Sequence, residues 1–356
     1  MKLSDFGFDG EMRKHAEAMD LGGFQVGRII EEQRDRYSLL AEAGEYDAEI
    51  TGNLRFSAER SEDLPAVGDW VLASLLEHNF AVIHAILPRR SVLRRRALGT
   101  KGEAQIIAAN VDGALLVQAA DRDFNLNRLE RYRIICAEAG VPSYVVITKT
   151  DLFPASYVEE LTRSVEARLP GAAVFAASNA TQDGMEALGA RLEAGKTYCL
   201  LGSSGVGKSS LINSLSGSAL AKTGAISELT GKGRHVTSSR SLLVLESGAI
   251  IIDNPGMREV GMIDGEDGLE GAFDAIAALA KECRFADCTH TRESGCAVAE
   301  ALEKGLLDKG LYNNYLKLRK EAEYFASTKA ESHRKNREFG RMAKAYQKFQ
   351  KKGRGD

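Results

Sequence analysis

Hydrophobic positions follow one pattern between Phe24 and Arg96 and another further along the chain. In this first region, short segments alternate apolar and polar residues and are separated by glycine-containing turns. Alternation predicts half-buried strands, because successive side chains of a strand point to opposite faces. Five such segments predict a small β-barrel, and we expect one of the OB type. The segments are residues 25–30, 36–40, 47–56, 68–72 and 81–86.

Apolar runs and helical patterns alternate in the next region. The runs cover residues 113–117, 144–147, 173–176 and 198–201, and the helical patterns cover 125–139, 155–169 and 183–194. This order predicts an α/β fold with a doubly wound parallel sheet. Two later runs, 241–246 and 249–253, meet at Ser247-Gly248 and predict an antiparallel hairpin. From Leu311 the chain is expected to be helical.

Length and composition set the class of protein. The chain has 356 residues, of which 44% are hydrophobic, enough for two or three domains with real cores. No apolar run approaches a membrane span, and the N-terminus lacks the apolar core of a signal peptide, so we expect a cytoplasmic protein without a membrane partner. The net charge is −3, yet residues 317–356 hold 13 Lys or Arg and only 5 Asp or Glu. A basic tail on an acidic body predicts contact with a polyanion.

A phosphate-binding loop follows the fourth apolar run. Residues 202–209 read G-x4-G-K-S between a predicted strand and a predicted helix. Its glycines let several backbone N–H groups approach phosphate oxygens, and the helix N-terminus adds its positive dipole. Lys208 would neutralise the β- and γ-phosphates during binding and catalysis, and Ser209 would ligate Mg²⁺. The predicted nucleotide contacts in this loop are Gly202, Ser203, Ser204, Gly205, Val206, Gly207, Lys208, Ser209 and Ser210.

The second apolar run ends in Thr148-Lys149-Thr150-Asp151, which predicts recognition of guanine. The Asp151 carboxylate can accept hydrogen bonds from guanine N1–H and N2–H₂, a donor pair that adenine lacks, and the Lys149 stem can cover the base. Ser178-Asn179 ends the next run and is assigned to the same site. Thr148 stands where such loops usually carry Asn, and its hydroxyl retains fewer hydrogen bonds than an amide.

Asp253-Asn254-Pro255-Gly256 closes the last predicted strand. Asp253 would reach Mg²⁺ through water, and the Gly256 amide would sense the γ-phosphate. Base recognition therefore precedes the phosphate loop in the chain, which is not the ordinary order of a GTPase. The same site forms if the ordinary termini are joined and the chain is opened elsewhere, so the sequence predicts a circularly permuted GTPase domain.

Three of the five cysteines gather in Cys283-x4-Cys288-x-His290-x5-Cys296. Three thiolates and an imidazole supply the four ligands of a closed tetrahedral zinc site, which indicates a structural role. Cys136 and Cys199 are expected to lie in the core.

Two sets of residues are candidates for nucleic-acid contact. Aromatic residues of the barrel would either stack on bases or fill its core, and the arginines that follow would either meet a polyanion or form a solvated face. The aromatic residues are Tyr37, Phe56, Trp70 and Phe80, and the arginines are Arg89, Arg90, Arg94, Arg95 and Arg96. The C-terminal stretch from Arg334 to Lys352, with Tyr346 and Phe349 among its basic residues, is predicted to be an RNA-binding arm.

Together these residues resemble one family, the circularly permuted small-subunit ribosome biogenesis GTPases called RsgA or YjeQ. The resemblance covers residues 24–315 and rests on the permuted motif order, on Gly233-Arg-His-Val-Thr-Ser238 and on the zinc pattern. It implies a monomer that binds the small ribosomal subunit and its rRNA, acts late in subunit maturation and hydrolyses GTP when stimulated by the subunit. The expected parts are an N-terminal extension (1–23), an OB-fold RNA-binding barrel (24–96), a circularly permuted GTPase domain (97–262), a zinc-binding subdomain (263–310) and a basic C-terminal helix (311–356).

The residue that activates water is the least determined part of the site. Met257 follows Asp-x-x-Gly where Ras-like enzymes carry Gln, and a thioether cannot orient water. His235 is the candidate, against the alternative that it contacts RNA or packs the loop. Thr237 is assigned as the switch threonine that ligates Mg²⁺, because Val236 cannot. The surrounding segment, residues 224–239, is expected to be mobile without ligand.

Two other functions stay open at this point. One is an RNA-binding assembly scaffold that uses GTP as a structural ligand without significant turnover, which the absent glutamine favours. The other is an ATP-dependent enzyme, which Asp151 opposes.

Overall fold

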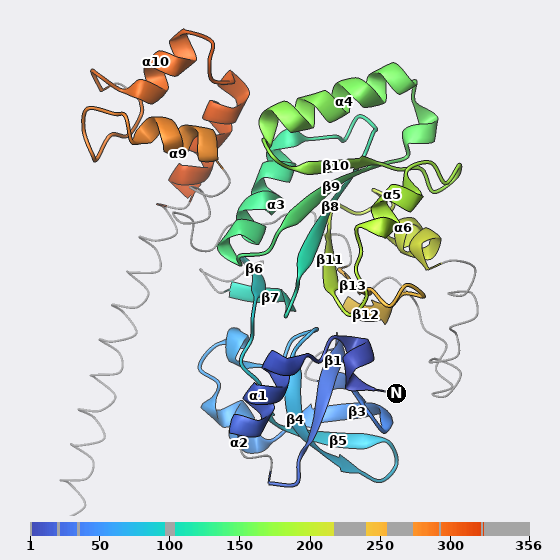
Figure 1. Ribbon diagram of the computed structural model, residues 1–356. Coiled ribbons are helices and arrows are strands. Elements are labelled where there is room, and N and C mark those ends of the chain that lie inside the picture. The colour runs from blue at the N-terminus through green and yellow to red at the C-terminus, as the bar shows by residue number, and fades with distance from the viewer. Residues whose placement is uncertain are drawn as a thin grey trace, which may run out of the picture.

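The computed structural model describes residues 2–19, 22–33, 36–96, 104–216, 240–254, 273–291, 293–321 and 323. These residues form a β-barrel, an α/β layer next to it and a small helical subdomain beside the α/β layer (Figure 1). In this described part of the chain, no helix is long and apolar enough to cross a membrane.

The predicted barrel is present. Its strands are β1 (Gln25–Gln33), β2 (Arg36–Ala41), β3 (Gly44–Ile50), β4 (Trp70–Leu76) and β5 (Phe80–Ile86). They pair in the order β1-β2-β3-β5-β4, and β4 returns to β1 and closes the ring. The β3–β5 pairing is parallel and the other four are antiparallel. Alternate residues of these strands fill the barrel, which is the pattern that predicted it.

The third predicted strand, residues 47–56, is wrong over its second half. β3 ends at Ile50, and Thr51 caps the helix α2 (Gly52–Ser57) by accepting a hydrogen bond from Leu54 N at 3.2 Å. A hydroxyl that satisfies a free N–H of the first turn starts a helix where apolar alternation alone suggests a strand. Phe56, near the end of α2, is 92% exposed. A 3-10 turn, η2 (Ser61–Asp63), leads on to β4.

The α/β layer agrees with the predicted doubly wound sheet. Its strands are β8 (Gly113–Ala119), β9 (Ser143–Thr148), β10 (Ala173–Ala176), β11 (Thr197–Leu201), β12 (Arg240–Val244) and β13 (Ile250–Asp253). In the order β10-β9-β8-β11-β13-β12, the first five strands are parallel, and β12 forms the predicted antiparallel hairpin with β13.

Helices cover both faces of this sheet. The helices α3 (Leu126–Glu138) and α4 (Ala155–Arg168) pack on one face, and α5 (Met185–Ala190) and α6 (Lys208–Leu215) pack on the other. Adjacent residues of a strand belong to opposite cores: Leu116 faces α3, whereas Leu115 and Val117 face α5 and α6. Burial on both sides explains why these strands are continuous apolar runs.

A hairpin that the sequence did not indicate joins the barrel to the α/β layer. It consists of β6 (Val92–Arg96) and β7 (Ala104–Ala109), which pair antiparallel. Leu93 and Ile107 are buried in the same core as Trp70 of the barrel and Ile252 of the sheet. The expected boundary between residues 96 and 97 therefore falls between two paired strands.

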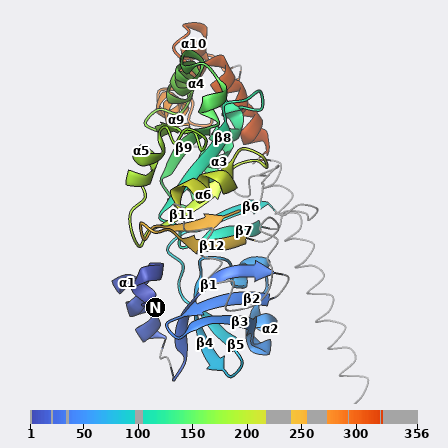
Figure 2. The same cartoon turned by 90° about the vertical axis from the view of Figure 1, so that its right-hand side faces the viewer.

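A strand pairing also links the two parts. Glu31 and Glu32 of β1 pair with Ser241 and Arg240 of β12, so barrel and α/β sheet form one continuous hydrogen-bonded sheet. Figure 2 shows β12 between the barrel strands and the parallel strands. The two domains are thus joined by backbone hydrogen bonds and by a shared core.

The N-terminal segment packs against the barrel. It contains η1 (Leu3–Phe6) and α1 (Gly10–Ala18), and the Asp9 carboxylate caps α1 by accepting from the N–H groups of Glu11 and Met12 at 3.0 Å. Phe8 and Met12 are buried, and the Phe8 ring centroid lies 4.9 Å from that of Trp70. Residues 2–19, to which sequence reasoning assigned no role, therefore complete the core next to the barrel.

Arg28 of β1 ties this segment to both domains and is 1% exposed. Its guanidinium donates to Phe6 O, to Gly68 O at 3.3 Å and to Thr197 Oγ1 of β11 at 2.9 Å. Burial lowers the pKa of Arg28 to about 10, and nearby Asp112 opposes this shift. A buried arginine is tolerated here because neighbouring oxygens accept its hydrogen bonds.

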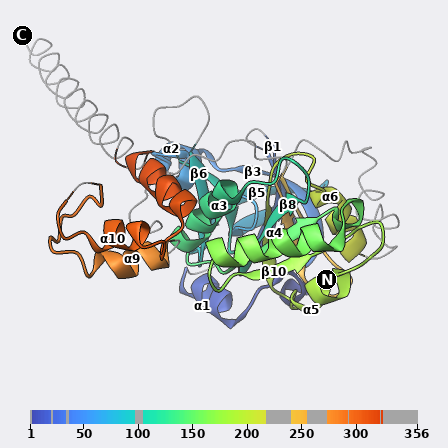
Figure 3. The same cartoon turned by 90° about the horizontal axis from the view of Figure 1, so that it is seen from above.

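The C-terminal subdomain contains α9 (Asp274–Ala280), α10 (Ala297–Glu303) and a helix over residues 309–321. Figure 3 shows α9 and α10 beside α3, on the side of the sheet opposite α6. Their common core includes Phe273, Leu311 and Leu318, together with Ile134 of α3. The helix α3 therefore has one face in the α/β core and another in the C-terminal core.

Candidate functional site

The predicted phosphate loop connects β11 to α6. Gly205 and Gly207 have φ values of 83° and 93°, which side chains other than glycine rarely adopt. At Gly202, a Cβ atom would stand 2.5 Å from Val117 O of the neighbouring strand. Lys208 bends back over the loop, and its Nζ donates to Gly202 O at 2.7 Å and Ser203 O at 2.9 Å. The ammonium group is thus held against the backbone of the loop, close to where a bound phosphate would lie.

Asp253 lies across from this loop, at the end of β13 and in register with Leu200 of β11. Its Oδ1 atom is buried and has no hydrogen-bond partner among the described residues. Burial raises the pKa of Asp253 while Lys208 lowers it, and burial lowers the pKa of Lys208 while Asp253 raises it. Ser209, the second residue of α6, is exposed. A buried carboxylate oxygen without a partner fits a hard cation such as Mg²⁺.

The predicted base loop follows β9. Lys149 has φ 59° and turns the chain into η3 (Thr150–Leu152), and its Nζ lies 3.2 Å from Asp121 Oδ2. Asp151 is exposed, and its Oδ1 accepts a hydrogen bond from Ser178 Oγ at 2.7 Å. This bond fixes the orientation of the carboxylate and therefore also the direction of its other oxygen.

Thr148 joins the base loop to the phosphate loop. It is fully buried, and its Oγ1 lies 2.5 Å from Val206 O and 3.3 Å from Gln118 O. A hydroxyl has one hydrogen to donate, so both carbonyls share it, and the shorter contact is to the phosphate loop. The contact links residues that are 58 positions apart in the chain.

Asn179, in the loop after β10, also lies where the base loop contacts the phosphate loop. If Gly207 carried a Cβ, that atom would lie 3.6 Å from Thr148 Oγ1 and 3.7 Å from Asn179 Nδ2. Asn179 Oδ1 is buried and has no hydrogen-bond partner in the described part of the chain. The residues assigned to base and phosphate therefore come together at the carboxyl ends of the parallel strands β9, β10 and β11, of which β9 and β11 flank β8. Ligands bind at this edge of open α/β sheets.

Three residues near the phosphate loop were not assigned by sequence reasoning. Tyr132 of α3 is buried, which raises its pKa, and it hydrogen-bonds the side chain of Ser203. Asn254, noted only as a departure from the family pattern, is buried and contacts Cys199 Sγ at 3.0 Å. Asp121 pairs with Lys149. No sequence signal marks Tyr132 or Asp121, because each reaches the site from the loop or helix after β8.

Three assigned residues, His235, Thr237 and Gly256, lie outside the described residues, as does the segment 224–239. The basic arm from Arg334 to Lys352 also lies outside them.

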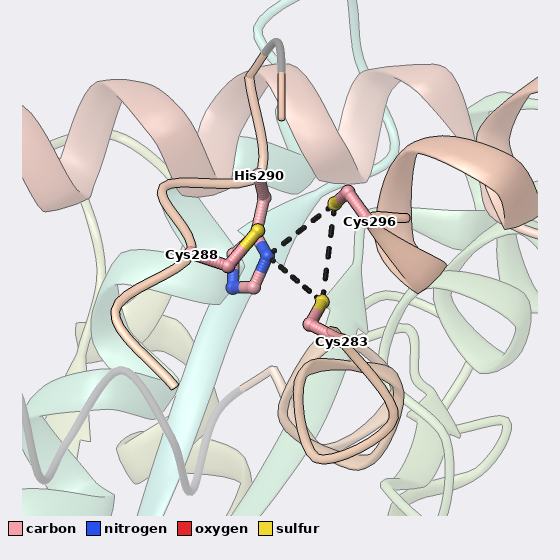
Figure 4. A group of neighbouring side chains, drawn as sticks. All are labelled: Cys283, Cys288, His290 and Cys296. Atoms are coloured by element: carbon pink, nitrogen blue, oxygen red, sulfur yellow. Dashed lines mark hydrogen bonds between the residues drawn. The ribbon is translucent and has the colours of Figure 1, made fainter. Parts of the chain in front are cut away.

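The four predicted metal ligands come together (Figure 4). The Cys283 and Cys296 sulfurs are 3.9 Å apart, and His290 Nδ1 lies 3.5 Å from the first and 3.6 Å from the second. All four ligand atoms, including Cys288 Sγ, lie within 4.8 Å of one another. Ligands about 2.3 Å from a tetrahedral zinc would be about 3.8 Å apart, so the cluster fits a zinc ion.

The surroundings of the cluster hold its ligands in place. Cys296 caps α10 and accepts a hydrogen bond from Ala299 N at 3.4 Å, which fixes its sulfur at the start of the helix. The Tyr312 hydroxyl donates to His290 O at 2.6 Å and ties the ligand loop to the helix over residues 309–321. Cys136 and Cys199 are buried in the α/β core as expected, and burial raises the pKa of the Cys199 thiol to about 12.

Several candidate nucleic-acid contacts are used inside the fold instead. Tyr37 and Trp70 are 4% and 0% exposed, so they belong to the core and cannot stack on bases. Arg89 donates to Asp69, which is fully buried, and also to two backbone carbonyls. Arg90 pairs with Asp9 at 2.8 Å. Arg89 and Arg90 therefore stabilise the barrel and its N-terminal helix.

The other candidates differ in exposure. Arg94 pairs with Glu62 at 2.7 Å, and Arg95 donates to Gln105 at 3.2 Å. Phe80 is half-buried, whereas Phe56 is exposed. Phe56 is thus the barrel aromatic most accessible to a partner among the four considered.

Comparison with known proteins finds similarity to one family of GTPases. The family model described as RsgA GTPase matches residues 86–263. The chain is 41% identical over 338 residues to the small ribosomal subunit biogenesis GTPase RsgA of Opitutus terrae, which covers 92% of this chain and 91% of that protein. It is 42% identical over 299 residues to small ribosomal subunit biogenesis GTPase RsgA 2 of Lactiplantibacillus plantarum, which covers 84% of each chain.

Two solved structures are similar over most of the chain. The crystal structure of YjeQ from Thermotoga maritima has a TM-score of 0.61 and 24% identity, and the match covers 84% of this chain and 98% of that one. The structure of YloQ, described as a circularly permuted GTPase, has a TM-score of 0.59 and 25% identity, with 85% and 96% covered. The barrel, the permuted α/β domain and the cysteine-histidine cluster predicted from sequence agree with these similarities.

Proposed function

The chain belongs to the RsgA family of GTPases, and from this membership we propose that it couples GTP binding and hydrolysis to late maturation of the small ribosomal subunit. The observation that carries the proposal is the contact of Thr148 Oγ1 with Val206 O, at 2.5 Å. It supports a single site in which the guanine-binding loop and the phosphate loop act on the same nucleotide.

In this proposal the protein's own groups do the binding. The N–H groups of residues 202–207 and the N-terminus of α6 bind the phosphates. Lys208 exchanges its bonds to Gly202 O and Ser203 O for phosphate oxygens, which restores charge pairing to a partly desolvated ammonium. Asp151, oriented by Ser178, accepts hydrogen bonds from guanine N1–H and N2–H₂.

Magnesium bound with GTP would be held by Ser209, Thr237 and, through water, Asp253, and it would neutralise charge on the β- and γ-phosphates. Support comes from the unpartnered, buried Asp253 Oδ1 opposite the loop. Gly256 is proposed to sense the γ-phosphate two residues beyond Asn254. His235 is proposed to orient the attacking water, since Met257 cannot.

The cluster Cys283, Cys288, His290 and Cys296 is proposed to hold one structural zinc ion. Four protein ligands leave no open coordination position for substrate, which argues for a structural ion. The zinc would fix α9, α10 and the helix over residues 309–321 around the core that they share with α3.

Binding to rRNA is proposed for the barrel and for the basic C-terminal arm. Support comes from the exposed Phe56 of α2 and from the concentration of Lys and Arg after residue 317. We propose that it acts in the cytoplasm, where ribosomal subunits mature, and as a monomer.

GTP turnover by the purified protein, alone and with purified small subunits, tests the proposal. We expect slow intrinsic turnover of about 10⁻⁴ to 10⁻² s⁻¹, as in unassisted GTPases, and a clear increase with small but not large subunits. His235→Ala should abolish the increase and leave nucleotide binding nearly intact. Equal rates with and without subunits would contradict the proposal, and absence of single-turnover hydrolysis on the subunit would favour the scaffold function.

A further inference from the structure

Asp121 is an acidic residue next to the base loop that the proposed binding of nucleotide does not yet use. It lies two residues after β8, and its Oδ2 atom is 3.2 Å from Lys149 Nζ. Each of the two side chains is 33% exposed. Salt screens a partly buried ion pair less than an exposed one, so this pair can hold a long side chain in one direction.

The Asp121 carboxylate is itself held by its own loop. Its Oδ1 accepts a hydrogen bond from Asp123 N at 3.1 Å, and its backbone carbonyl accepts from Phe124 N at 2.9 Å. An aspartate that bonds a backbone N–H two residues further on forms a local turn that fixes its side chain. The other oxygen, Oδ2, is therefore directed at Lys149.

The backbone of Lys149 is fixed as well. Its φ of 59° lies in the left-handed region, which few residues other than glycine adopt, and its carbonyl accepts from Leu152 N at 3.2 Å. Lysine carries its ammonium group on a flexible four-carbon stem. With the backbone held at one end and the ammonium group at the other, the direction of this stem is set.

The strand order shows where the Lys149 stem runs. β8 lies between β9, which leads into the base loop, and β11, which leads into the phosphate loop (Figure 1). Lys149 follows β9 and reaches Asp121 beyond the end of β8, so its stem crosses from the base loop towards the phosphate loop. A nucleotide with its base on Asp151 and its phosphates on Lys208 has to cross the end of the same middle strand.

We propose that Asp121 is a positioning residue for nucleotide binding, which holds the Lys149 ammonium group beyond β8 so that the lysine stem forms an apolar surface against the base and the ribose. The inference rests on the proposed binding of guanine nucleotides at this site. An unpaired lysine loses rotamer freedom when a base packs on its stem, whereas a paired one has lost it already. Asp121 therefore strengthens binding without touching the nucleotide.

Asp121→Asn tests this role, because asparagine keeps an oxygen for the turn with Asp123 N and removes the charge that holds Lys149. The variant should bind GDP about two- to fivefold more weakly than wild type, as expected for the loss of one partly exposed ion pair. General electrostatics predicts the opposite sign, since loss of a negative charge near a phosphate site favours an anionic ligand. Competition with a fluorescent GDP derivative measures the dissociation constants.

Two further ligands separate the base from the phosphates. IDP offers the same ring system to the lysine stem and lacks only the 2-amino group that Asp151 would bind, so Asp121→Asn should weaken IDP and GDP by the same factor. Inorganic pyrophosphate has neither base nor ribose and should bind the variant at least as tightly as wild type. An equal loss of affinity for pyrophosphate and GDP would place Asp121 in support of the phosphate loop and would overturn the assignment.

Asp123→Asn is the matched control. It removes the same charge from an exposed side chain of the same turn and should not weaken GDP binding. Lys149→Met keeps an unbranched apolar stem without the ammonium group, and in that background Asp121→Asn should cause no further loss. A loss that persists there would come from damage to the fold and would overturn the positioning role.

The wild-type protein separates this inference from the proposed function. If it binds GDP no better than ADP, the proposed function itself fails. If it binds GDP selectively and Asp121→Asn binds GDP as tightly as wild type or more tightly, the function stands and this inference fails.

Discussion

Arg168 of α4 donates to Glu130 of α3 with 2.6 Å between Nε and Oε1, at the contact between the α/β layer and the C-terminal subdomain. Asn314 also donates to Glu130, and Asp308 lies 3.2 Å from Arg168 Nη1. Glu130 is fully buried, and burial raises its pKa to about 7 although Arg168 and Asn314 lower it. The C-terminal subdomain is therefore attached to the GTPase domain through a titratable group.

The first prediction concerns pH. The pKa of Glu130 is raised from 4.5 to about 7, so between these values the native protein binds more protons here than the unfolded chain. The free energy of opening at this contact is then highest below pH 4.5. It falls by about 3 kcal/mol at most as the pH rises through 7. Hydrogen exchange of α3 amides between pH 5 and 8, corrected for intrinsic rates, measures this change.

Glu130→Gln removes the titration and should give a nearly pH-independent opening free energy for the α3 amides. Glu321→Gln serves as control, because that carboxylate pairs with Arg131 nearby but is partly exposed. An equal pH dependence in wild type and Glu130→Gln would show that another group is responsible.

The second prediction concerns the N-terminal segment. Phe8 is buried against Trp70, the only tryptophan of the chain. Phe8→Ala should destabilise the protein by about 3 kcal/mol, because it leaves a cavity between α1 and the barrel. Denaturant unfolding followed by Trp70 fluorescence measures this, and the native emission should shift to longer wavelength. Phe56→Ala, at the exposed position, should change neither quantity.

The third prediction concerns the metal. The purified protein should contain one zinc per chain, and a strong chelator should release it with loss of helical signal from the C-terminal subdomain. Cys288→Ser should lower the zinc content well below one per chain, whereas Cys136→Ala, at a buried cysteine outside the cluster, should retain it. GDP binding should survive zinc removal, because the phosphate loop is formed by other elements. Full zinc content in Cys288→Ser would argue against the four-ligand site.

The fourth prediction concerns Thr148. Thr148→Val keeps the shape of the side chain and removes its hydrogen bonds to Val206 O and Gln118 O. Leaving a buried carbonyl without a partner costs about 1 to 3 kcal/mol, so GDP affinity should fall about five- to a hundredfold through loss of loop alignment. Isothermal titration measures the affinity. Thr162→Val, which removes a hydroxyl bond to Val158 O within α4, should leave it unchanged.

The candidate site was largely predictable because its signals are local. The phosphate loop, the stretch Thr148–Asp151 and the ligands Cys283–Cys296 each bring their chemistry within a few consecutive residues. Apolar runs located the parallel strands, and the carboxyl ends of parallel strands meet at one edge. The third barrel segment shows the limit: its alternation predicted a strand, and the Thr51 cap made its second half a helix.

Other features depend on partners distant in the chain. Arg89 and Arg90 looked available to a polyanion, but Asp69 and Asp9 neutralise them inside the fold. Local composition cannot distinguish a solvated arginine from a paired one, because the pairing partner is chosen by tertiary contacts.

The sequence by itself predicted the chemistry proposed for this protein: a nucleotide-binding loop, a guanine-selective carboxylate at Asp151 and a set of four metal ligands, since residue type and short spacing suffice to predict each. Tertiary structure alone decided how these parts cooperate. It placed Thr148 against Val206, Arg28 against Thr197 and Glu130 against Asn314, contacts 58, 169 and 184 residues apart. Such contacts arise only when the chain packs, because burial selects which distant polar groups must satisfy one another.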